Sequence, residues 1–544
     1  MKTSYDYIIV GAGSAGCVLA NRLSRDPGVS VLLVEAGSRG KSWLIDTPGA
    51  YMKLHKSKFD WGYWSEPQAA LDGRKLYLPR GKALGGSSAT NAMAYVRGNR
   101  QDYDDWAALG NNGWSYAEVL PYFKRSEDNA DLDNPYHGRA GELRVEYPNR
   151  FRTPFSEAFI EACVERGFRR NDDTNGAEQA GAGLFQFTIR DGKRESAFTA
   201  FLKPVLQRPN LTVLTDTRTT EVIIERDRAR GIRARSQVQR GRGTWEPQDH
   251  VFKAKREVIL SAGAFASPQL LLLSGVGDRE QLHRLGIESK VHLPGVGENL
   301  QDHLFVPVGC TSTKRIGQNG AGTLLGQVKS VYEYYVKKTG FLNIGPLEAV
   351  AYGSTSLSPD RVDYQFQFSS FHTGPGYTTD FHDYKTFPLN EDGYSILPSL
   401  LRPHSVGQLR LRTRNPRDAP IIQPNFFQDE RDRQVLIEAV KKAVEVLEAP
   451  AFDPYRKQLI SPPDRSSDGA IFEHIKKQVE TIYHPVGTCK MGHDEAAVVD
   501  DRLRVRGVEG LRVIDASVMP KIVSGNTNAA VYMIAERGAD FLLG

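Results

Sequence analysis

Largely apolar runs at four points of the chain predict strands buried in a parallel sheet. The runs cover residues 5–10, 29–34, 257–260 and 511–515. Helices cover both faces of a parallel sheet, so its strands are apolar throughout instead of alternating. A helical apolar face begins at Val18, between the first two runs. This order predicts an α/β fold with a Rossmann-like domain built on a parallel sheet.

A different pattern appears between residues 362 and 414, where apolar and polar residues alternate. Stretches such as 364–368 and 407–411 have the two-residue period of antiparallel strands with one solvated face. The loop at 372–398 separates them and can shape a substrate entrance. The alternation predicts a second, α+β substrate domain built on an antiparallel sheet.

Apolar residues at helical spacing predict an amphipathic helix over residues 324–336. Three uses of its apolar face are open, namely packing on a sheet, covering the active site and touching a membrane. We expect it to pack on a sheet, and peripheral membrane contact stays as an alternative.

The two patterns divide the chain into five segments. A dinucleotide-binding domain is expected from residues 1–150, 195–310 and 475–544, and its first segment includes the part that covers the cofactor. The substrate domain is expected from residues 151–194 and 311–474. Two to four domains are also what 544 residues predict, because one core of that size is unusual.

Composition narrows the class of protein. The formal net charge of +5 is mild, and the densest basic run, at 226–235, indicates a solvated hairpin, so no nucleic-acid partner is expected. Four dispersed cysteines without a Cys-x-x-Cys pair indicate a reducing compartment and no metal site. The first apolar run is too short for a signal peptide, and no run is long enough to span a membrane. We therefore expect a cytoplasmic protein without a transmembrane segment.

The turn after the first strand carries the chemistry of a dinucleotide site. Gly11 permits the tight turn, Gly13 lets a pyrophosphate approach the backbone, and Gly16 lets helix and strand pack closely. Glu35, about twenty residues later at the end of the second strand, can accept hydrogen bonds from a ribose diol. The acid disfavours the 2′-phosphate of NADP, while NAD and FAD both satisfy the loop.

Further small-residue turns decide between these two cofactors. Residues 80–98 form a second glycine-serine turn, in which the hydroxyls of Ser87 and Ser88 can hold phosphate oxygens or the polar flavin edge. Residues 261–277 form a third turn at a strand's carboxyl end, where open α/β sheets bind ligands. Together with the strand end at 511–515, four separated segments suit FAD held deep in the fold better than exchangeable NAD.

These segments resemble the glucose–methanol–choline (GMC) oxidoreductase family of FAD-dependent alcohol oxidases and dehydrogenases. The resemblance spans nearly the whole chain. Residues 81–98 and 263–277 are similar to the two signature patterns of the family, and HPVGTCKMG at 484–492 and SGNTNAA at 524–530 are similar to its active site. The run PGVGENLQDH at 294–303 is most similar to the choline dehydrogenase and alkanol dehydrogenase branch.

The resemblance implies a catalytic pair. The base of the family is the histidine of its His-Pro-x-Gly motif, here His484, and its partner is here Asn526. Imidazole suits proton abstraction near neutral pH, and Asn526 can donate to the developing alkoxide. Loss of the hydroxyl proton makes the carbinol carbon a hydride donor to the flavin. Glu348 is a candidate substrate contact, which cannot by itself establish a cationic substrate.

Contacts to FAD are expected from the three turns, the strand ends and the start of the last helix, with a flavin-ring contact at Asn91. The full set comprises Gly11, Gly13, Ser14, Gly16, Glu35, Ala36, Gly86, Ser87, Asn91, Ala92, Met93, Val222, Ala262, Asp515, Ala516, Thr527 and Asn528. Thr90 departs from the family signature. The resemblance implies a histidine at this position in relatives that bind flavin covalently. A threonine hydroxyl is a poor nucleophile, so FAD is expected to be held without a covalent bond.

The resemblance implies oxidation of a primary alcohol to an aldehyde, with a quinone-like acceptor or O2 taking the electrons. Three alternatives stay open: an oxidase that makes hydrogen peroxide, a lyase like the hydroxynitrile lyases, which bind FAD without redox use, and a non-catalytic flavoprotein. The presence of both His484 and Asn526 disfavours the last. We expect His303 to brace the cofactor cover and Cys489 to be a packing residue.

Overall fold

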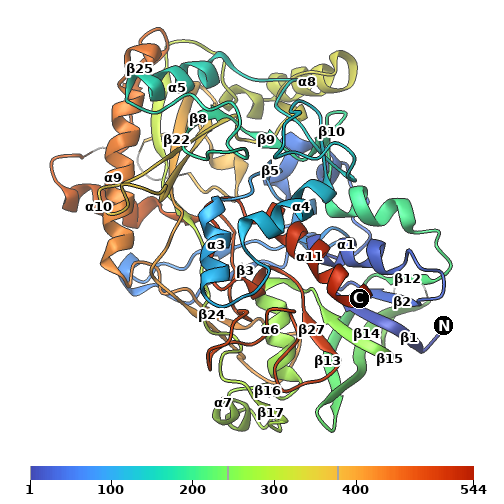
Figure 1. Ribbon diagram of the computed structural model, residues 1–544. Coiled ribbons are helices and arrows are strands. Elements are labelled where there is room, and N and C mark those ends of the chain that lie inside the picture. The colour runs from blue at the N-terminus through green and yellow to red at the C-terminus, as the bar shows by residue number, and fades with distance from the viewer. Residues whose placement is uncertain (1, 242–243, 376–378, 463) are drawn as a thin grey trace.

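The computed structural model describes residues 2–241, 244–375, 379–462 and 464–544 (Figure 1). Within these residues, a seven-stranded sheet and an eight-stranded sheet form the body of the protein. We call them the first sheet and the second sheet. The α/β class and the pairing of a parallel with an antiparallel sheet confirm the sequence prediction.

The first sheet is parallel where it carries the glycine turn. Its strand order is β12-β2-β1-β15-β14-β13, and β27 pairs with β15. The parallel strands are β1 (Ser4–Val10), β2 (Val31–Val34), β12 (Leu211–Leu214), β15 (Thr244–Leu260) and β27 (Leu511–Val513). An antiparallel hairpin of β13 (Thr217–Glu225) and β14 (Arg228–Gly241) extends it. This hairpin contains the basic run of residues 226–235.

Two helices from opposite ends of the chain pack together beside the first sheet. α1 (Ser14–Leu23) follows the glycine turn, and α11 (Asn528–Leu543) ends the chain (Figure 1). The hydroxyl of Ser14 donates to Oδ1 of Asn528 over 2.6 Å, which joins the two helix starts. The C-terminal segment is thereby held against the turn that the first strand leads into.

The second sheet is antiparallel, with the order β25-β19-β22-β21-β20-β8 and with β18 pairing both β22 and β26. Its strands are β8 (Gly181–Leu184), β18 (Leu304–Phe305), β19 (Val308–Ser312), β20 (Ala349–Gly353), β21 (Tyr364–Ser369), β22 (Gly393–Leu400), β25 (Arg456–Leu459) and β26 (Glu480–Thr481). Strands β18 and β26 lie outside the two segments predicted for the substrate domain, and the division into five segments stays a prediction.

The expected solvated face is wrong for residues 364–368, although β23 (Gln408–Arg410), in a separate pair with β24 (Ile421–Gln423), does alternate partly exposed polar residues with the buried Leu409. Every residue of β21 and β22 is buried. The apolar face packs on helices α5 (Pro154–Glu165) and α9 (Glu430–Leu447), while the polar face, including Gln367 and Ser369, turns toward an internal cavity. The alternation is therefore real, but its polar positions meet the inside of the protein instead of solvent.

Shorter elements connect and cover the two sheets. The remaining helices are α2 (Trp43–Asp46), α3 (Arg100–Ala108), α4 (Tyr116–Ser126), α6 (Gly263–Leu273), α7 (Arg279–Arg284), α8 (Leu324–Tyr332) and α10 (Asp468–Gln478). The remaining strands are β3 (Tyr63–Trp64), β4 (Tyr77–Leu78), β5 (Ala94–Tyr95), β6 (Glu127–Asn129), β7 (Leu143–Val145), β9 (Gln186–Phe187), β10 (Ile189–Arg190), β11 (Lys193–Arg194), β16 (Val276–Gly277), β17 (Val291–His292), β23 (Gln408–Arg410) and β24 (Ile421–Gln423). In the part of the chain that the structure describes, no helix is both long and apolar enough to cross a bilayer.

Helix α8 departs from its predicted packing. It forms within the expected range, but its apolar residues are exposed, with Leu324 at 79% and Leu325 at 82% of full accessibility. The expectation that this face packs on a sheet is therefore wrong.

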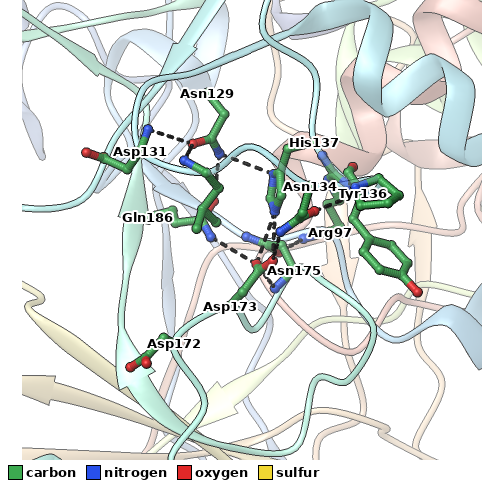
Figure 2. Close-up of polar contacts among 12 residues, drawn as sticks. Arg97, Asn129, Asp131, Asn134, Tyr136, His137, Asp172, Asp173, Asn175 and Gln186 are labelled. Carbon is green, nitrogen blue, oxygen red and sulfur yellow. Dashed lines mark hydrogen bonds and ion pairs between the residues drawn. The ribbon is translucent and has the colours of Figure 1, made fainter.

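A buried polar network stabilises the segment that follows β5 (Figure 2). His137 lies between two carboxylates, with Nδ1 2.9 Å from Oε1 of Glu127 and Nε2 3.0 Å from Oδ2 of Asp173. Glu127 also pairs with the buried guanidinium of Arg97. Asn175 accepts from the backbone N–H of Arg97 over 2.8 Å, so the network fixes the chain just after the expected flavin-ring contact.

The network predicts a pH-dependent contribution to stability. The two carboxylates raise the pKa of His137 above its ordinary value, although burial alone would lower it. Because the folded-state pKa is raised, the stabilisation is complete below about pH 6.5 and is lost as pH rises through the raised pKa.

We expect His137→Gln to lower the free energy of unfolding by about 3 kcal/mol at acidic pH, with a smaller effect at alkaline pH. Urea denaturation as a function of pH measures this difference. His493→Gln, at an exposed turn, is the control and should leave the profile unchanged. An equal loss for His137→Gln at every pH would contradict the charged state of the imidazole.

Candidate active site

A cavity of about 450 Å³ is lined by residues from both sheets. The first sheet contributes the ends of β1 and β2, and the second contributes the polar face of β21. The expected site residues in its wall are Gly11, Gly13, Ser14, Glu35, Ala36, Gly86, Ser87, Asn91, Ala92, Met93, Ala262, His484, Asp515, Ala516, Asn526, Thr527 and Asn528. The structure thus brings together segments from both ends of the chain.

Three expected site residues lie outside the cavity wall. Gly16 lies behind the glycine turn, where a β-carbon would come within 1.9 Å of the Gly11 carbonyl oxygen, so its role is close packing. Val222 is buried in β13 and its backbone N–H donates to Ser274, while Thr217 and Thr219 of the same strand line the cavity instead.

Glu348 is the third, and the structure does not bring it to the site. The side chain is fully buried, and one carboxylate oxygen accepts from both the backbone N–H and the hydroxyl of Thr153, over 2.7 and 2.9 Å. The other accepts from Gln318 and Ser370. Protein donors satisfy both oxygens behind the wall, so the expected contact with substrate is not found.

The glycine turn fits a phosphate group. Gly13 precedes the first turn of α1, and no side chain caps this helix, so its first backbone N–H groups are open to a ligand. A β-carbon on Gly13 would meet nothing nearer than 3.9 Å, whereas a β-carbon on Gly86 would lie 2.6 Å from the α-carbon of Gly13. The two glycine turns therefore touch each other and leave room for a pyrophosphate beside Gly13.

Glu35 braces the glycine turn and can still accept further hydrogen bonds. Its Oε1 accepts from the backbone N–H of Gly37 over 2.7 Å, and its Oε2 accepts from that of Ala12 over 2.9 Å. Each carboxylate oxygen can accept a second hydrogen bond, and Glu35 lines the cavity. It can therefore hold the glycine turn and still receive the ribose hydroxyls of FAD.

Asp515 uses its carboxylate to fix two turns of the cavity wall. Its Oδ2 accepts from the backbone N–H of Gly263 over 2.8 Å and from Ser267, and its Oδ1 accepts from the backbone N–H of Ser517 over 2.8 Å. The side chain of Asp515 thus holds the start of α6 against the end of β27, which leaves Ala516 at the cavity surface.

Arg194 positions the expected flavin-ring contact, and sequence reasoning missed it. Its Nη1 donates to the carbonyl oxygen of Asn91 over 2.6 Å and to Oδ1 of the same residue over 2.9 Å. Burial lowers the pKa of Arg194 to about 9. About a hundred residues separate the two in sequence, so no local spacing could have paired them.

A chain of hydrogen bonds fixes the proton on the imidazole of His484. Nε2 of His303 lies 2.9 Å from the carbonyl oxygen of Leu401, which can only accept, so this nitrogen carries the proton of His303. Nδ1 of the neutral His303 is then an acceptor, and it lies 3.0 Å from Nδ1 of His484. His484 must therefore be protonated at Nδ1 and carry a lone pair at Nε2.

That lone pair faces Asn526. Nδ2 of Asn526 lies 3.3 Å from Nε2 of His484, and only the amide nitrogen can donate across this contact. Oδ1 of Asn526 is buried and has no hydrogen-bond partner among the described residues. One acceptor nitrogen and one amide thus meet at the cavity surface.

The backbone under both histidines is held by Asp302. Its Oδ1 accepts from the backbone N–H of His303 over 2.9 Å and from that of His484 over 2.7 Å. Burial raises the pKa of Asp302 to about 7, which the nearby Arg80 opposes. Burial, His303 and Arg80 lower the pKa of His484 well below its ordinary value, and burial lowers that of His303 to about 4.

Sequence reasoning assigned His303 to bracing and did not connect it with the base. The only sign in the sequence that His303 belongs to the site was its place in the PGVGENLQDH run at 294–303. The two histidines are 181 positions apart, and their contact arises from tertiary structure alone.

Cys489 is fully buried, and burial raises the pKa of its thiol well above the ordinary value, which agrees with a packing role. Among the described residues, no group of three or more side chains could hold a metal ion.

Comparison with known proteins places these features in a family. Two family models described as GMC oxidoreductase match the chain, one over residues 5–305 and one over residues 403–535. Human mitochondrial choline dehydrogenase is 41% identical over 100% of this chain and 90% of its own length. The alcohol dehydrogenase [acceptor] of Pseudomonas putida is 41% identical over 99% of this chain and 96% of its own length.

Solved structures agree with this relationship. Pyridoxine 4-oxidase from Mesorbium loti superposes with a TM-score of 0.86 at 31% identity, covering 98% of each chain. The formate oxidase of Aspergillus oryzae superposes with a TM-score of 0.90 at 28% identity, covering 99% of this chain and 98% of its own.

The hydrogen-bond chain predicts the state of His484 in the resting enzyme. We expect Nδ1 to be protonated, Nε2 to be unprotonated, and the ring to stay neutral as pH falls below about 6.5 because its pKa is lowered. Nitrogen NMR of ¹⁵N-histidine-labelled protein measures both properties, with His484→Ala to assign the signals. Protonation at Nε2 of the neutral ring would contradict the tautomer derived from the Leu401 carbonyl. Titration at the ordinary pKa would contradict the lowered pKa of His484.

Proposed function

Because this chain belongs to the GMC oxidoreductase family, we propose that its cavity oxidises a primary alcohol to an aldehyde, with His484 as the base. Membership of this family makes the chain an FAD-dependent enzyme that acts on CH–OH groups. Its relatives include proteins named choline dehydrogenase and alcohol dehydrogenase [acceptor]. These relatives favour alcohol oxidation over the lyase alternative. The observation that carries the proposal is the chain of contacts from the Leu401 carbonyl through His303 to His484, which leaves Nε2 of His484 as an acceptor facing Asn526 at the cavity surface.

His484 takes the hydroxyl proton in the proposed reaction. Its lone pair at Nε2 can accept that proton, while its Nδ1–H keeps the ring oriented through His303. The lowered pKa keeps His484 neutral and ready to accept at physiological pH. His303 is a positioning residue here, because it holds the imidazole in the reactive tautomer without facing the reacting atoms.

Asn526 stabilises the alkoxide that forms when the proton leaves. Its amide nitrogen donates toward Nε2 of His484 in the resting structure, and a substrate oxygen entering between them can receive the same donor. An amide cannot take a proton in exchange, so the two residues have separate roles. The buried, unpartnered Oδ1 of Asn526 is a further acceptor for a bound ligand.

The residues of the cavity wall fit FAD. The glycine turn, Glu35, the second turn at Gly86 and Asn91, and the strand end at Asp515 would hold it. FAD, when bound there, supplies the acceptor for the hydride of the carbinol carbon. The chain itself orients the alcohol, removes its proton and excludes water.

The cavity wall near the histidines favours an alcohol with an apolar body. Phe305, Phe371, Phe381 and Leu397 line the cavity and belong to one buried hydrophobic cluster, against which Ile482 packs. Apolar and aromatic walls bind alkyl or aryl groups through burial of their surface. Glu348, the candidate substrate contact, lies behind the wall with both oxygens bonded to protein donors. We therefore propose an uncharged alkyl or aryl alcohol.

A quinone-like acceptor is our proposal for the re-oxidation of the flavin. The relative from Pseudomonas putida is named for an unspecified acceptor, and other relatives are named oxygen-dependent choline dehydrogenases. The motif similarity to the alkanol dehydrogenase branch supports the acceptor over O2.

Four buried cysteines without disulfide partners support a reducing, cytoplasmic compartment.

Replacement of His484 tests the base. His484→Ala should leave FAD bound and slow anaerobic flavin reduction by a primary alcohol by about 100-fold or more, because a general base is removed. Stopped-flow absorbance of the flavin measures this rate, and His493→Ala is the matched control. Reduction at the wild-type rate in His484→Ala would exclude His484 as the base.

Two variants of Asn526 separate its role from that of His484. In Asn526→Asp, a carboxylate repels the developing alkoxide, so reduction should slow by about 10-fold or more. In Asn526→His, a donor is retained, so part of the rate should remain. Equal rates in Asn526→Asp and the wild type would place Asn526 away from the reacting oxygen.

We propose that FAD is bound without a covalent link. Thr90 lines the cavity in place of a histidine, and none of the four cysteines, all within the described residues, is part of its wall. Acid precipitation should therefore release yellow flavin into the supernatant, where absorbance quantifies it against the protein. Colour that stays with the pellet would mean that another side chain, such as His55 in the cavity wall, is linked to the flavin.

A further inference from the structure

The helical segment Leu324–Lys337, formed by α8 and the single π-helical turn η7 (Glu333–Lys337), presents its apolar side to solvent. We call this side the α8 surface. Its side chains are 44–82% exposed and comprise Leu324, Leu325, Val328, Val331, Tyr332, Tyr335 and Val336. They recur at the three- and four-residue spacing of one helix face. Figure 1 shows α8 at the periphery of the molecule.

The same segment attaches to the protein by its small and polar side. Gly326 packs so closely that a β-carbon would lie 2.2 Å from the Gly320 carbonyl oxygen. Ser330 is 5% exposed, and the hydroxyl of the buried Tyr334 donates to the carbonyl oxygen of Gly192 over 3.1 Å. These positions are four residues apart and form the inner face. The helix is therefore amphipathic, but its apolar side faces solvent and its small and polar side faces the protein, the opposite of an ordinary surface helix.

Basic residues flank the helical segment in the sequence. Residues 312–345 contain five basic side chains and one acidic side chain, Glu333, whose carboxylate lies 3.9 Å from Lys329. The five basic residues are Lys314, Arg315, Lys329, Lys337 and Lys338, and all are exposed. Lysines at the border of an apolar face complement anionic lipid headgroups, and tyrosines favour the interface between lipid and water.

We propose that the α8 surface docks on an anionic membrane. A second copy of this chain is a poorer occupant, because a two-fold interface would bring together two surfaces bordered by lysines, which repel each other. The fourteen residues of Leu324–Lys337 extend about 21 Å, which is too short to cross the hydrocarbon core. The segment therefore lies in the plane of the interface with its apolar side chains among the acyl chains.

Docking would place a wall of the catalytic cavity next to the bilayer. α8 packs against η8 (Phe341–Asn343), a short 3₁₀ turn that packs in turn on the 3₁₀ helix η1 (Pro48–Leu54). Leu54 of η1 and Leu347, just after η8, line the cavity. An apolar alcohol or acceptor dissolved in the membrane would thus reach the cavity without a long path through water.

Flotation of the FAD-loaded enzyme with lipid vesicles tests the proposal. The wild type should float with vesicles of phosphatidylcholine mixed with phosphatidylglycerol, and less with phosphatidylcholine alone. The triple variant Leu324→Gln/Leu325→Gln/Val328→Gln should lower the partition coefficient by about 10-fold or more, because apolar burial is lost. The control Val164→Gln/Leu357→Gln/Val406→Gln removes apolar side chains with 39–43% exposure elsewhere and should float like the wild type.

A charge variant separates the electrostatic contribution to membrane binding from the contribution of apolar burial. Lys329→Gln/Lys337→Gln/Lys338→Gln should weaken binding to the anionic vesicles by about fivefold for each lysine and leave binding to phosphatidylcholine unchanged. Oxidation of a water-soluble alcohol with a soluble dye should be unaffected in all variants, which verifies folding.

Two outcomes would overturn membrane docking. One is a wild type that does not float, or an α8 variant that floats as the wild type does. The other is a wild-type dimer that the α8 variant converts to a monomer in sedimentation velocity without any vesicle binding, which would assign the surface to a second copy.

Discussion

The pairing of β15 with two other strands is the constraint on which the site depends. Leu260 at the end of β15 is in register with Val10 of β1 on one side and with Val513 of β27 on the other. These parallel pairs place the glycine turn and the Asp515 turn at the same sheet edge, although most of the chain separates them. The last segment of the chain, with His484 and Asn526, is held at that edge. The expected cofactor contacts and the proposed catalytic residues therefore share one cavity because of a backbone register, before any side chain contributes.

Local chemistry made part of the site predictable. The glycine turn, Glu35 and Asp515 could be derived from short stretches, because a parallel strand, a tight turn and a helix start impose their residue types within a few positions. The partnership of His303 with His484, and that of Arg194 with Asn91, could not be derived. Both contacts join residues far apart in sequence. His303 and His484 meet because the neighbouring strands β18 and β26 pair within the second sheet, and Arg194 reaches Asn91 from the separate β10–β11 hairpin. The positions of Val222 and Glu348 outside the cavity wall could not be derived either, because tertiary packing sets where each lies relative to the cavity.

Two errors in the sequence prediction have a common physical cause. A period of two or of 3.6 residues shows that an element has an apolar and a polar side, but it does not show which surroundings each side meets. In β21 and β22 the polar side faces an internal cavity, which suits a sheet that must contact a polar cofactor and a reacting alcohol. In α8 the apolar side faces outward, and the small residues Gly326 and Ser330 form the attachment. In both elements the period was correct and the assumed surroundings were wrong.

The hydrogen-bond chain behind His484 also governs where a proton can go. It ends at the carbonyl oxygen of Leu401, which accepts a hydrogen bond but cannot pass a proton onward. In the proposed reaction, a proton taken up at Nε2 of His484 has no exit through His303, so it must leave through the cavity itself. Proton release is then coupled to departure of the aldehyde or to re-oxidation of the flavin. The enzyme would retain one proton for as long as the reduced cofactor and product stay enclosed.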